Sequence, residues 1–353
     1  MFFVILQKNK KRMKKTLILL LALVAFSTAY ATDWLAHIDD DRRVCRLSIP
    51  GTHDACTGYG FVPQDTLLGN LIARTQELNI SEQWAVGVRA FDLRPDVRET
   101  QADDKVKRTL QVFHGEYATE QTFAGVFDVL RDSLKAHPTE FAIIIMQHER
   151  SPHRSGRGWE AMVDYVLSKN SDLLVDFRPD ITVGQMRGRI LVFSRDTYRE
   201  TPRGAYIDGW HFRPDVDWQY PATIRGYAKE GTLTIQDFYN MTWEGGMTTK
   251  LSAIERLLRA ANSAEVAAVL PDMWFVNQTS GYMYMTAEYT GKSVSTTEGY
   301  RANASYTNRF LTRLLTGRMN AGIVLMDFAG VRRSGDYEVG GDELVKAVIR
   351  SNF

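Results

Sequence analysis

The 353-residue chain has few cysteines and little net charge, and these two features argue against a zinc-binding protein and a polyanion-binding protein. Cys45 and Cys56 are its two cysteines, and without a matching pair of histidines they do not make a zinc site. The formal net charge is +1, so the composition gives no sign of a surface that binds polyanions. The sequence also lacks a glycine-rich nucleotide loop, an internal repeat and a linker. One large domain is therefore expected.

The one long apolar run lies near the N-terminus and has the flanks of a secretory signal peptide. Residues 8–15 are mostly basic, residues 16–26 are almost wholly apolar, and residues 29–31 form a small-x-small cleavage site. We expect cleavage after Ala31, a folded domain over residues 32–353, and a periplasmic or secreted location. An uncleaved anchor is the weaker interpretation, because the run is short for a membrane-spanning helix.

Eight short apolar runs, mostly separated by helical patterns, predict a parallel sheet. Such continuous hydrophobicity is typical of strands covered on both faces. The predicted strands are 46–49, 88–93, 110–113, 141–146, 190–193, 232–236, 273–276 and 323–326. They indicate an α/β fold with a single irregular TIM-type (β/α)8 barrel, and a doubly wound open sheet is the alternative. Residues 101–108 are polar and charged, which predicts a solvated loop, and residues 196–225 are expected to be irregular.

The first predicted strand ends at a distinctive turn. Pro50 cannot donate to a sheet ladder and Gly51 permits a sharp bend, so both are expected to end the strand and present His53 and Asp54. An imidazole beside a carboxylate at a strand end is suited to acid–base chemistry. A turn whose polar side chains only cap backbone groups is the alternative. The cysteines flank this strand, so a disulfide and two separate buried thiols both remain open.

Polar or ionisable residues follow the C-terminal end of every predicted strand. They are His53 and Asp54, Asp92 and Arg94, His114, Gln147 and Glu149, Arg195, Asp237 and Tyr239, Asn277, and Asp327. In a barrel these ends meet at the mouth that holds the active site. A merely hydrated rim is the alternative, but two histidines, arginines and several carboxylates at successive strand ends favour a site.

These side-chain types predict acid–base chemistry on a phosphodiester. Two histidines, whose ordinary pKa is about 6.5, can divide the roles of general base and general acid. A guanidinium between them suits a phosphate through bidentate hydrogen bonds. A carboxylate behind each histidine would orient its ring. This is the layout for in-line attack of a neighbouring hydroxyl on a phosphodiester.

Three motifs carry a resemblance to a known family. Residues 48–54 (SIPGTHD), 88–94 (VRAFDLR) and 113–115 (FHG) closely resemble, in order and strand placement, the X-domain motifs of bacterial phosphatidylinositol-specific phospholipase C. Residues 236–239 (QDFY) and 326–327 (MD) are similar to its later motifs. The resemblance implies cleavage of phosphatidylinositol, or of glycosylated inositol lipids, to diacylglycerol and inositol 1,2-cyclic phosphate.

The resemblance also implies roles for the two histidines and their partners. His53 resembles the general base that takes the proton from the inositol 2-hydroxyl, and Asp327 resembles the carboxylate paired with it. His114 resembles the general acid that protonates the diacylglycerol oxygen, with Asp54 as its partner.

Arg94 resembles the phosphate-stabilising arginine, with Asp92 beside it, and it bears on metal use. Related calcium-dependent enzymes place carboxylates and calcium where the bacterial ones place this arginine. A fixed guanidinium supplies the positive charge that a metal would otherwise supply. We therefore expect no metal and no other cofactor.

The residues that resemble inositol-binding groups are Arg195, Asp237 and Tyr239. The chain departs from the family at the end of the fourth strand, where the pattern has a lysine and this sequence has Gln147, or His148 in a shifted alignment. Glu149 fits the pattern better, although a solvated carboxylate at a helix start is an equal alternative. The departure leaves recognition of the ring hydroxyls, and with it the preferred headgroup, open.

Aromatic and methionine side chains near the expected mouth predict contact with a lipid interface. They are Tyr59, Phe61, Trp243, Met247, Tyr282, Met283 and Tyr284. Ordinary loop packing over the mouth is the equal alternative. We expect a peripheral, monomeric enzyme on membranes that contain phosphatidylinositol, without affinity for nucleic acid.

Two other functions are weaker alternatives. A metal-dependent glycerophosphodiesterase is also a barrel with paired histidines, but it would need an acidic metal-binding cluster near its first histidine. A catalytically inactive module that binds inositol lipids would have no need of an acid–base pair.

Overall fold

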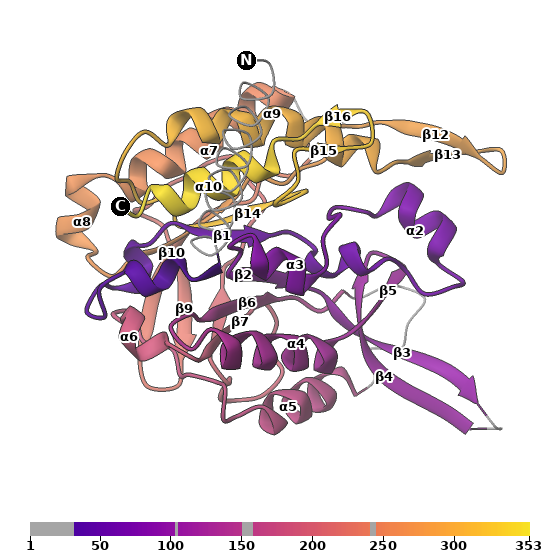
Figure 1. Ribbon diagram of the computed structural model, residues 1–353, viewed down its shortest axis with the longest axis horizontal. Coiled ribbons are helices and arrows are strands. Elements are labelled where there is room, and N and C mark those ends of the chain that lie inside the picture. Colours follow the sequence, from indigo (N-terminus) through magenta and orange to yellow (C-terminus); the bar gives the residue numbers. More distant parts are fainter. Residues whose placement is uncertain (1–31, 103–104, 150–157, 241–244) are drawn as a thin grey trace, which may run out of the picture.

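The computed structural model describes residues 32–102, 105–149, 158–240 and 245–353 (Figure 1). The predicted signal peptide lies outside the described residues. Among the described helices, none combines the length and apolarity needed to cross a bilayer. Cys45 and Cys56 are both buried and free, and they lie on either side of the first strand.

A closed barrel forms the centre of the molecule. Its strands, in order around the barrel, are β1 (Ile49–Thr52), β14 (Ile323–Met326), β11 (Trp274–Gln278), β10 (Glu230–Gln236), β9 (Ala222–Gly226), β8 (Ala205–Asp208), β7 (Ile190–Ser194), β6 (Ala142–Met146) and β2 (Ala90–Leu93). Neighbours are parallel except that β9 is antiparallel to both β8 and β10. The prediction of an irregular TIM-type barrel is confirmed, and the open-sheet alternative is wrong.

One of the eight predicted strands does not belong to the barrel. Residues 110–113 lie in β4 (Lys105–His114), the middle strand of an antiparallel sheet with β3 (Pro95–Ala102) and β5 (Tyr117–Thr122). They are apolar because they are buried beside the barrel, with Leu110 and Val112 in the main core and Phe113 in a smaller cluster. The predicted solvated loop at 101–108 is also wrong, because its described residues continue β3 and β4.

Two barrel strands, β8 and β9, were not predicted and come from the stretch that was expected to be irregular, so the closed barrel has nine strands where eight were expected. β8 is four residues long and alternates between buried and half-buried positions, so it has no continuous apolar run. The other predicted strands coincide with barrel strands to within a few residues.

The first strand is displaced towards its C-terminus. A 3₁₀ turn covers Val44–Arg46, and β1 then runs through Pro50 and Gly51 instead of ending at them. A side chain at Gly51 would meet the Leu325 side chain of β14 at 2.8 Å and the Ala90 side chain of β2 at 3.0 Å. Gly51 is therefore needed for close strand packing and not for a turn.

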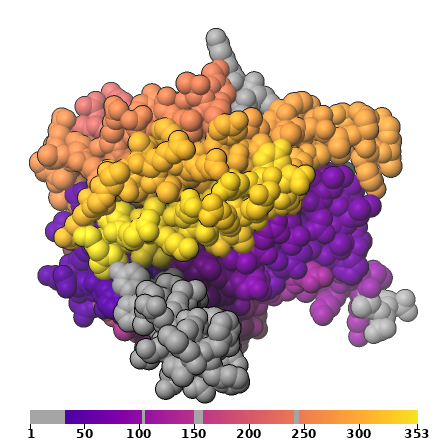
Figure 2. All heavy atoms as spheres, turned by 45° about the horizontal axis from the view of Figure 1, so that its top comes forward, coloured from indigo at the N-terminus to yellow at the C-terminus, as the bar shows by residue number. Residues whose placement is uncertain are grey.

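Helices surround the barrel between its strands (Figure 1). They are α2 (Thr66–Ile72), α3 (Ile80–Ala85), α4 (Phe123–Ala136), α5 (Trp159–Lys169), α6 (Val183–Met186), α7 (Gly246–Ala261), α8 (Ala264–Val269), α9 (Glu298–Leu314) and α10 (Gly341–Arg350). Figure 2 shows the C-terminal α10 lying across the N-terminal part of the chain. The Asn352 side chain accepts from the Ser48 N–H at 2.9 Å and donates to the Ser48 carbonyl at 2.8 Å, which ties this end to β1.

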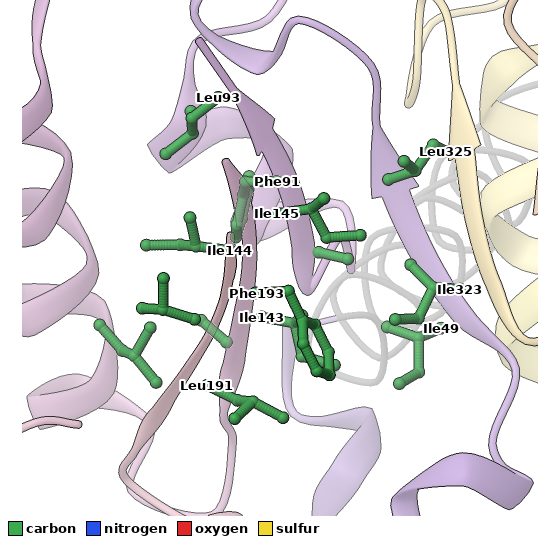
Figure 3. Close-up of a cluster of buried hydrophobic side chains, with 14 of the residues drawn as sticks. Ile49, Phe91, Leu93, Ile143, Ile144, Ile145, Leu191, Phe193, Ile323 and Leu325 are labelled. Carbon is green, nitrogen blue, oxygen red and sulfur yellow. The ribbon is translucent and has the colours of Figure 1, made fainter. Parts of the chain in front are cut away.

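Large apolar side chains pack on both faces of the barrel strands (Figure 3). Every residue of β6 is fully buried, as expected for a strand covered on both faces. Phe91 and Phe193, from β2 and β7, lie in the same cluster. Since apolar residues occupy the interior, the polar residues that end the strands are left to line its C-terminal mouth.

Two hairpins extend beyond the barrel on the same side of the molecule (Figure 1). One is the β3–β4 hairpin, and the other joins β12 (Thr286–Tyr289) to β13 (Lys292–Ser295). Both lie in connections that leave the C-terminal ends of barrel strands, β2 and β11.

Candidate active site

A pocket of about 240 Å³ opens at the C-terminal ends of the barrel strands. It is lined by His53, Arg94, His114, Gln147, Phe212, Asp237, Tyr239, Gln278, Gly281 and Tyr300. Six of these residues were predicted from strand ends, which shows that the structure brings them to one mouth. Phe212, Gln278, Gly281 and Tyr300 were not predicted.

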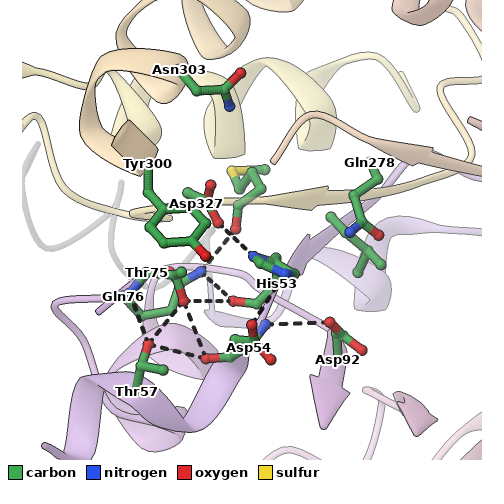
Figure 4. A network of polar contacts seen from close by, with 12 residues as sticks. His53, Asp54, Thr57, Thr75, Gln76, Asp92, Gln278, Tyr300, Asn303 and Asp327 are labelled. Atoms are coloured by element: carbon green, nitrogen blue, oxygen red, sulfur yellow. Dashed lines mark hydrogen bonds and ion pairs between the residues drawn. The ribbon is translucent and has the colours of Figure 1, made fainter. Parts of the chain in front are cut away.

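His53 and Asp327 meet because their strands are adjacent and in register. Thr52 of β1 pairs with Met326 of β14, so the next residue of each strand faces the other. His53 Nδ1 lies 2.9 Å from Asp327 Oδ1 (Figure 4). The Asp327 side chain is fully buried, and His53 is 7% exposed. The carboxylate therefore fixes the orientation of the ring.

The backbone just beyond this pair is held in a sparsely populated conformation. Asp54 and Phe328, which follow His53 and Asp327, have φ angles of +44° and +54°. Such left-handed non-glycine residues persist where surrounding structure holds them. The Gln76 amide does so by donating to the carbonyls of His53 and Met326, each at 2.8 Å (Figure 4).

Asp54 and Arg94 lie between the two histidines. Asp54 Oδ2 is 3.1 Å from His53 Nε2 and 3.3 Å from His114 Nε2, so this carboxylate contacts both rings and not His114 alone. Arg94 places Nη2 3.0 Å from His53 Nε2 and Nε 2.8 Å from Asp54 Oδ1. The two imidazole centroids are 5.9 Å apart.

His114 reaches the pocket from the end of β4, which lies outside the barrel. Its Nδ1 lies 2.6 Å from the Ala73 carbonyl, which requires that nitrogen to carry a proton. Nε2 then faces the Tyr300 hydroxyl at 3.2 Å. Tyr300 comes from the first turn of α9, so no strand-end pattern pointed to it.

Burial and neighbouring charges shift the pKa values of the two histidines in opposite directions. Burial alone lowers the pKa of His53, but the Asp54 and Asp327 carboxylates outweigh it and raise this pKa to about 9. Burial, with the charges of Arg94 and His53, lowers the pKa of His114 to about 4. The two rings therefore differ in their affinity for a proton.

Asp92 adds a further buried carboxylate beneath Arg94. Its Oδ2 lies 3.8 Å from Arg94 Nη2 and accepts a long hydrogen bond of 3.4 Å from the Asp54 N–H. Among the described residues, His53, Asp54 and Asp92 form one group whose ligand atoms all lie within 4.8 Å, a spacing that fits a metal ion. The Arg94 guanidinium contacts all three members of this group and so already supplies positive charge there.

Phe212, Asp237 and Tyr239 line another part of the pocket, and Arg195 and Trp210 lie behind them without lining it. The Arg195 guanidinium lies over Trp210, 4.1 Å from the ring centroid, and Trp210 donates to Asp237 Oδ2 at 2.8 Å. Tyr239 is 44% exposed and packs edge-on against Phe212, with the centroids 5.6 Å apart. The structure thus brings together the predicted Arg195, Asp237 and Tyr239, and it adds two aromatic residues that the strand-end pattern missed.

The two candidate residues at the end of β6 lie in different places. Gln147 lines the pocket, whereas His148 stacks on Trp159 with a centroid distance of 4.4 Å and lies outside the pocket lining. Glu149 accepts from the Gly115 N–H and lies 3.6 Å from Arg94 Nη1. Its side chain is 8% exposed, so the alternative of a solvated carboxylate is wrong.

A buried lysine contacts the backbone of Gln278, one of the residues that line the pocket. Lys250, on α7, is fully buried, and its Nζ lies 2.5 Å from the Gln278 carbonyl and 3.3 Å from Gln236 Oε1. Burial lowers its pKa to about 7, against the opposing pull of Asp237 and Asp327. Residues 250, 253, 254, 257, 258 and 261 form the buried stripe of α7, so helical spacing was the signal that could have revealed it.

The aromatic residues predicted at a lipid interface differ in exposure. Tyr284 is 67% exposed, whereas Phe61 is 1% exposed and packs against the Tyr117 ring, so the prediction for Phe61 is wrong. Tyr59, Met247, Tyr282 and Met283 are partly buried, which leaves their role open. Trp243 lies outside the described residues.

Comparison with known proteins extends the resemblance to nearly the whole chain. No family model matches. A curated relative from Staphylococcus aureus strain NCTC 8325, named 1-phosphatidylinositol phosphodiesterase, is 24% identical over 365 residues, which cover 97% of this chain and 99% of the relative. A protein of the same name from Listeria monocytogenes is 25% identical over 173 residues, which cover 46% of this chain and 48% of that protein.

Solved structures agree with these relatives. The chain matches a Staphylococcus aureus phosphatidylinositol-specific phospholipase C with a TM-score of 0.67 and 21% identity, covering 91% of this chain and 98% of that one. It matches the Listeria monocytogenes enzyme with a TM-score of 0.59 and 20% identity, covering 92% and 99%. In sequence and in fold, the chain thus resembles the bacterial phosphatidylinositol-specific phospholipases C along almost its entire length.

Proposed function

We propose that the chain is a phosphatidylinositol diacylglycerol-lyase, a phospholipase C that releases diacylglycerol and inositol 1,2-cyclic phosphate. One observation carries the proposal. Two imidazoles face one pocket with centroids 5.9 Å apart, and the Arg94 guanidinium and Asp54 carboxylate lie between them. This is the set of groups that an internal phosphate transfer needs, because it combines an acid, a base and a fixed positive charge.

The proposed step moves two protons and exchanges one phosphorus–oxygen bond for another. His53 Nε2 accepts the proton of the inositol 2-hydroxyl, and the 2-oxygen attacks phosphorus in line. The bond from phosphorus to the diacylglycerol oxygen breaks, and His114 Nε2 donates a proton to that oxygen. Arg94 stabilises the charge on the phosphate oxygens, and Asp327 stabilises the charged His53.

The pKa shifts run opposite to the roles in this step, because the raised pKa belongs to His53, the base, and the lowered pKa to His114, the acid. Asp54 Oδ2 contacts Nε2 of both rings, at 3.1 and 3.3 Å, so it is placed to pass the proton from His53 to His114. A bound phosphodiester anion offsets the charge of Arg94, which helps to lower the pKa of His114, and so favours this transfer. After cleavage the proton is again on His53, and neutral His114 can then activate water for slow hydrolysis of the cyclic product.

Recognition of the inositol ring rests on acceptors that have no partner within the described part of the chain. Three lining residues present such oxygens, namely Gln147 Oε1, Asp237 Oδ1 and Gln278 Oε1. Ring hydroxyls would donate to them, while Tyr239 offers an aromatic face for stacking. Gln147 contributes no charge where the family pattern has a lysine, so we propose that Arg195 supplies the cation on this side.

We further propose that the protein is exported, acts as a monomer and requires no metal. The signal-like N-terminus supports export. The position of Arg94 among His53, Asp54 and Asp92 supports metal-independent chemistry, because a guanidinium there competes with a cation for the same carboxylates. A metal-dependent glycerophosphodiesterase is disfavoured on the same ground, and an inactive binding module is disfavoured by the acid–base pair.

The test is cleavage of phosphatidylinositol vesicles by the purified mature chain, with and without a chelator. We expect activity that survives chelation and falls by at least 10³-fold in His53→Ala, in line with loss of a general base. Activity that requires added calcium or another divalent ion would contradict the metal-free proposal. Lipid binding without turnover in the unsubstituted protein would favour the binding module.

A further inference from the structure

The β3–β4 hairpin forms an arm that begins and ends at residues of the candidate active site. Arg94 immediately precedes β3, and His114 is the last residue of β4, so both of its strands are anchored by site residues. Eight residues of β3 span about 25 Å at the usual rise per residue. The arm extends away from the barrel on the same side as the β12–β13 hairpin (Figure 1).

The two faces of this arm carry different charges, and the strand register assigns each side chain to a face. Thr100 pairs with Lys107 and Arg98 pairs with Thr109, and Lys105 lies two residues before Lys107 in β4, so these residues share one face. We call Arg98, Lys105 and Lys107 the basic face.

The opposite face is close to neutral. It carries Gln101, Val106 and the pair Glu99–Arg108, which are joined by an ion pair of 2.8 Å. No ion pair is found for Arg98, Lys105 or Lys107 within the described residues, and both lysines are exposed. Two exposed lysines and the half-buried Arg98 therefore share one face of the described part of the arm, in a chain whose overall net charge is only +1.

We propose that the basic face docks on the anionic phospholipid surface that contains the substrate. The inference rests on the proposed function, because phosphatidylinositol is itself an anionic lipid and any bilayer rich in it has a negative surface potential. Lysine and arginine side chains close to such a surface each strengthen binding about fivefold, and the attraction fades within a Debye length. An arm rooted at Arg94 and His114 would thus hold the pocket near the headgroups.

Two neighbouring residues allow a matched comparison. Lys107→Gln and Arg108→Gln remove the same charge at adjacent positions but on opposite faces. Binding is measured by co-sedimentation with vesicles of phosphatidylcholine mixed with phosphatidylglycerol, and with vesicles of phosphatidylcholine alone. We expect Lys107→Gln to weaken binding to the anionic vesicles about fivefold and Arg108→Gln to leave it within twofold.

The combined variant Arg98→Gln, Lys105→Gln, Lys107→Gln extends the test. Binding to the anionic vesicles should fall roughly 100-fold, and the salt dependence of binding should become shallower. Cleavage of a short-chain, monomeric phosphatidylinositol should keep its kcat/KM, because no member of the basic face lines the pocket.

The inference is overturned if the triple variant binds anionic vesicles as well as the unsubstituted protein. It is also overturned if binding to phosphatidylcholine alone falls equally, or if cleavage of the monomeric substrate falls in parallel, since either result indicates a structural role. Failure of the proposed function gives a different result, because the unsubstituted protein then fails to cleave even the monomeric substrate.

Discussion

Asp54 is the residue that links the two histidines, because its carboxylate contacts both rings. Its carboxylate touches Nε2 of each ring and binds Arg94 through its other oxygen. The sequence placed Asp54 beside His53 but could not show that it lies between the rings. That arrangement requires His114 to return from an outlying sheet.

The role of His114 as the acid can be tested by changing the leaving group. His114→Ala should lower kcat/KM for phosphatidylinositol by about 10²–10⁴-fold, the usual worth of a general acid. With a 4-nitrophenyl ester of inositol phosphate, whose leaving group needs no proton, the same variant should lose less than about tenfold. His53→Ala is the matched control and should lose activity on both substrates. Equal losses of His114→Ala on the two substrates would assign it another role.

Lys250 gives a prediction about stability and pH. Its pKa in the folded protein is about 7, below the ordinary value of 10.5, so the unfolded chain holds a proton there that the folded chain releases above pH 7. The lysine therefore makes the folded state more stable as pH rises from 7 towards 10.5. His53 has the opposite effect, because its raised pKa stabilises the fold below pH 6.5 and that contribution is lost as pH rises through about 9.

A variant isolates the lysine from the histidine. As pH rises from 7 to 9, the free energy of unfolding of the unsubstituted protein should increase relative to that of Lys250→Met by up to about 2 kcal/mol. The variant has no lysine whose pKa is lowered by folding, so it lacks this increase. Urea unfolding at several pH values measures this difference. A gap that is independent of pH would mean that Lys250 is protonated in the folded state throughout this range.

At the scale of elements, β1 shows which features of a strand can be predicted from local sequence and which cannot. The strand and its polar end were predicted, but Pro50 and Gly51 were expected to end it. Their tertiary role is different, because neighbouring strands approach Gly51 too closely for any side chain. Such packing is invisible in the local sequence.

The close approach of neighbouring strands at Gly51 predicts that a side chain there lowers both stability and activity. Gly51→Ala should lower stability by about 1–3 kcal/mol, the usual cost of overpacking a core. It should also lower kcat, because the strand carries His53. Adding Leu325→Val, which removes the nearest methyl group, should recover part of both losses. If the single variant matched the unsubstituted protein in stability and in kcat, the packing argument would be wrong.

The misplaced third strand has an equally physical cause. Residues 110–113 are as apolar as a barrel strand because they too are buried, and burial alone does not say against which sheet. β8 escaped notice for the converse reason, since half of its residues are only partly buried. Gln278, the last residue of β11, was missed because the predicted strand stopped at residue 276 and Asn277 was taken as its polar end. Tyr300 was missed because a helix start carries no polar signature of a pocket.

For the whole molecule, the sequence predicted the barrel and the end at which the pocket lies. Burial requires apolar residues along the strands, and solvent access allows polar residues at their ends, so both features can be recognised in the sequence. The contacts between those ends depend on closure of the barrel, which brings β1 beside both β2 and β14. That closure places Asp327 against His53 across 274 residues of chain.

The central claim is that the inositol 2-hydroxyl attacks its own phosphate. Phosphorus NMR of the first product released from phosphatidylinositol tests it most directly. We predict inositol 1,2-cyclic phosphate as the first water-soluble product, followed by slow appearance of inositol 1-phosphate. If inositol 1-phosphate formed from the outset with no cyclic intermediate, water would be the nucleophile and the account would be contradicted.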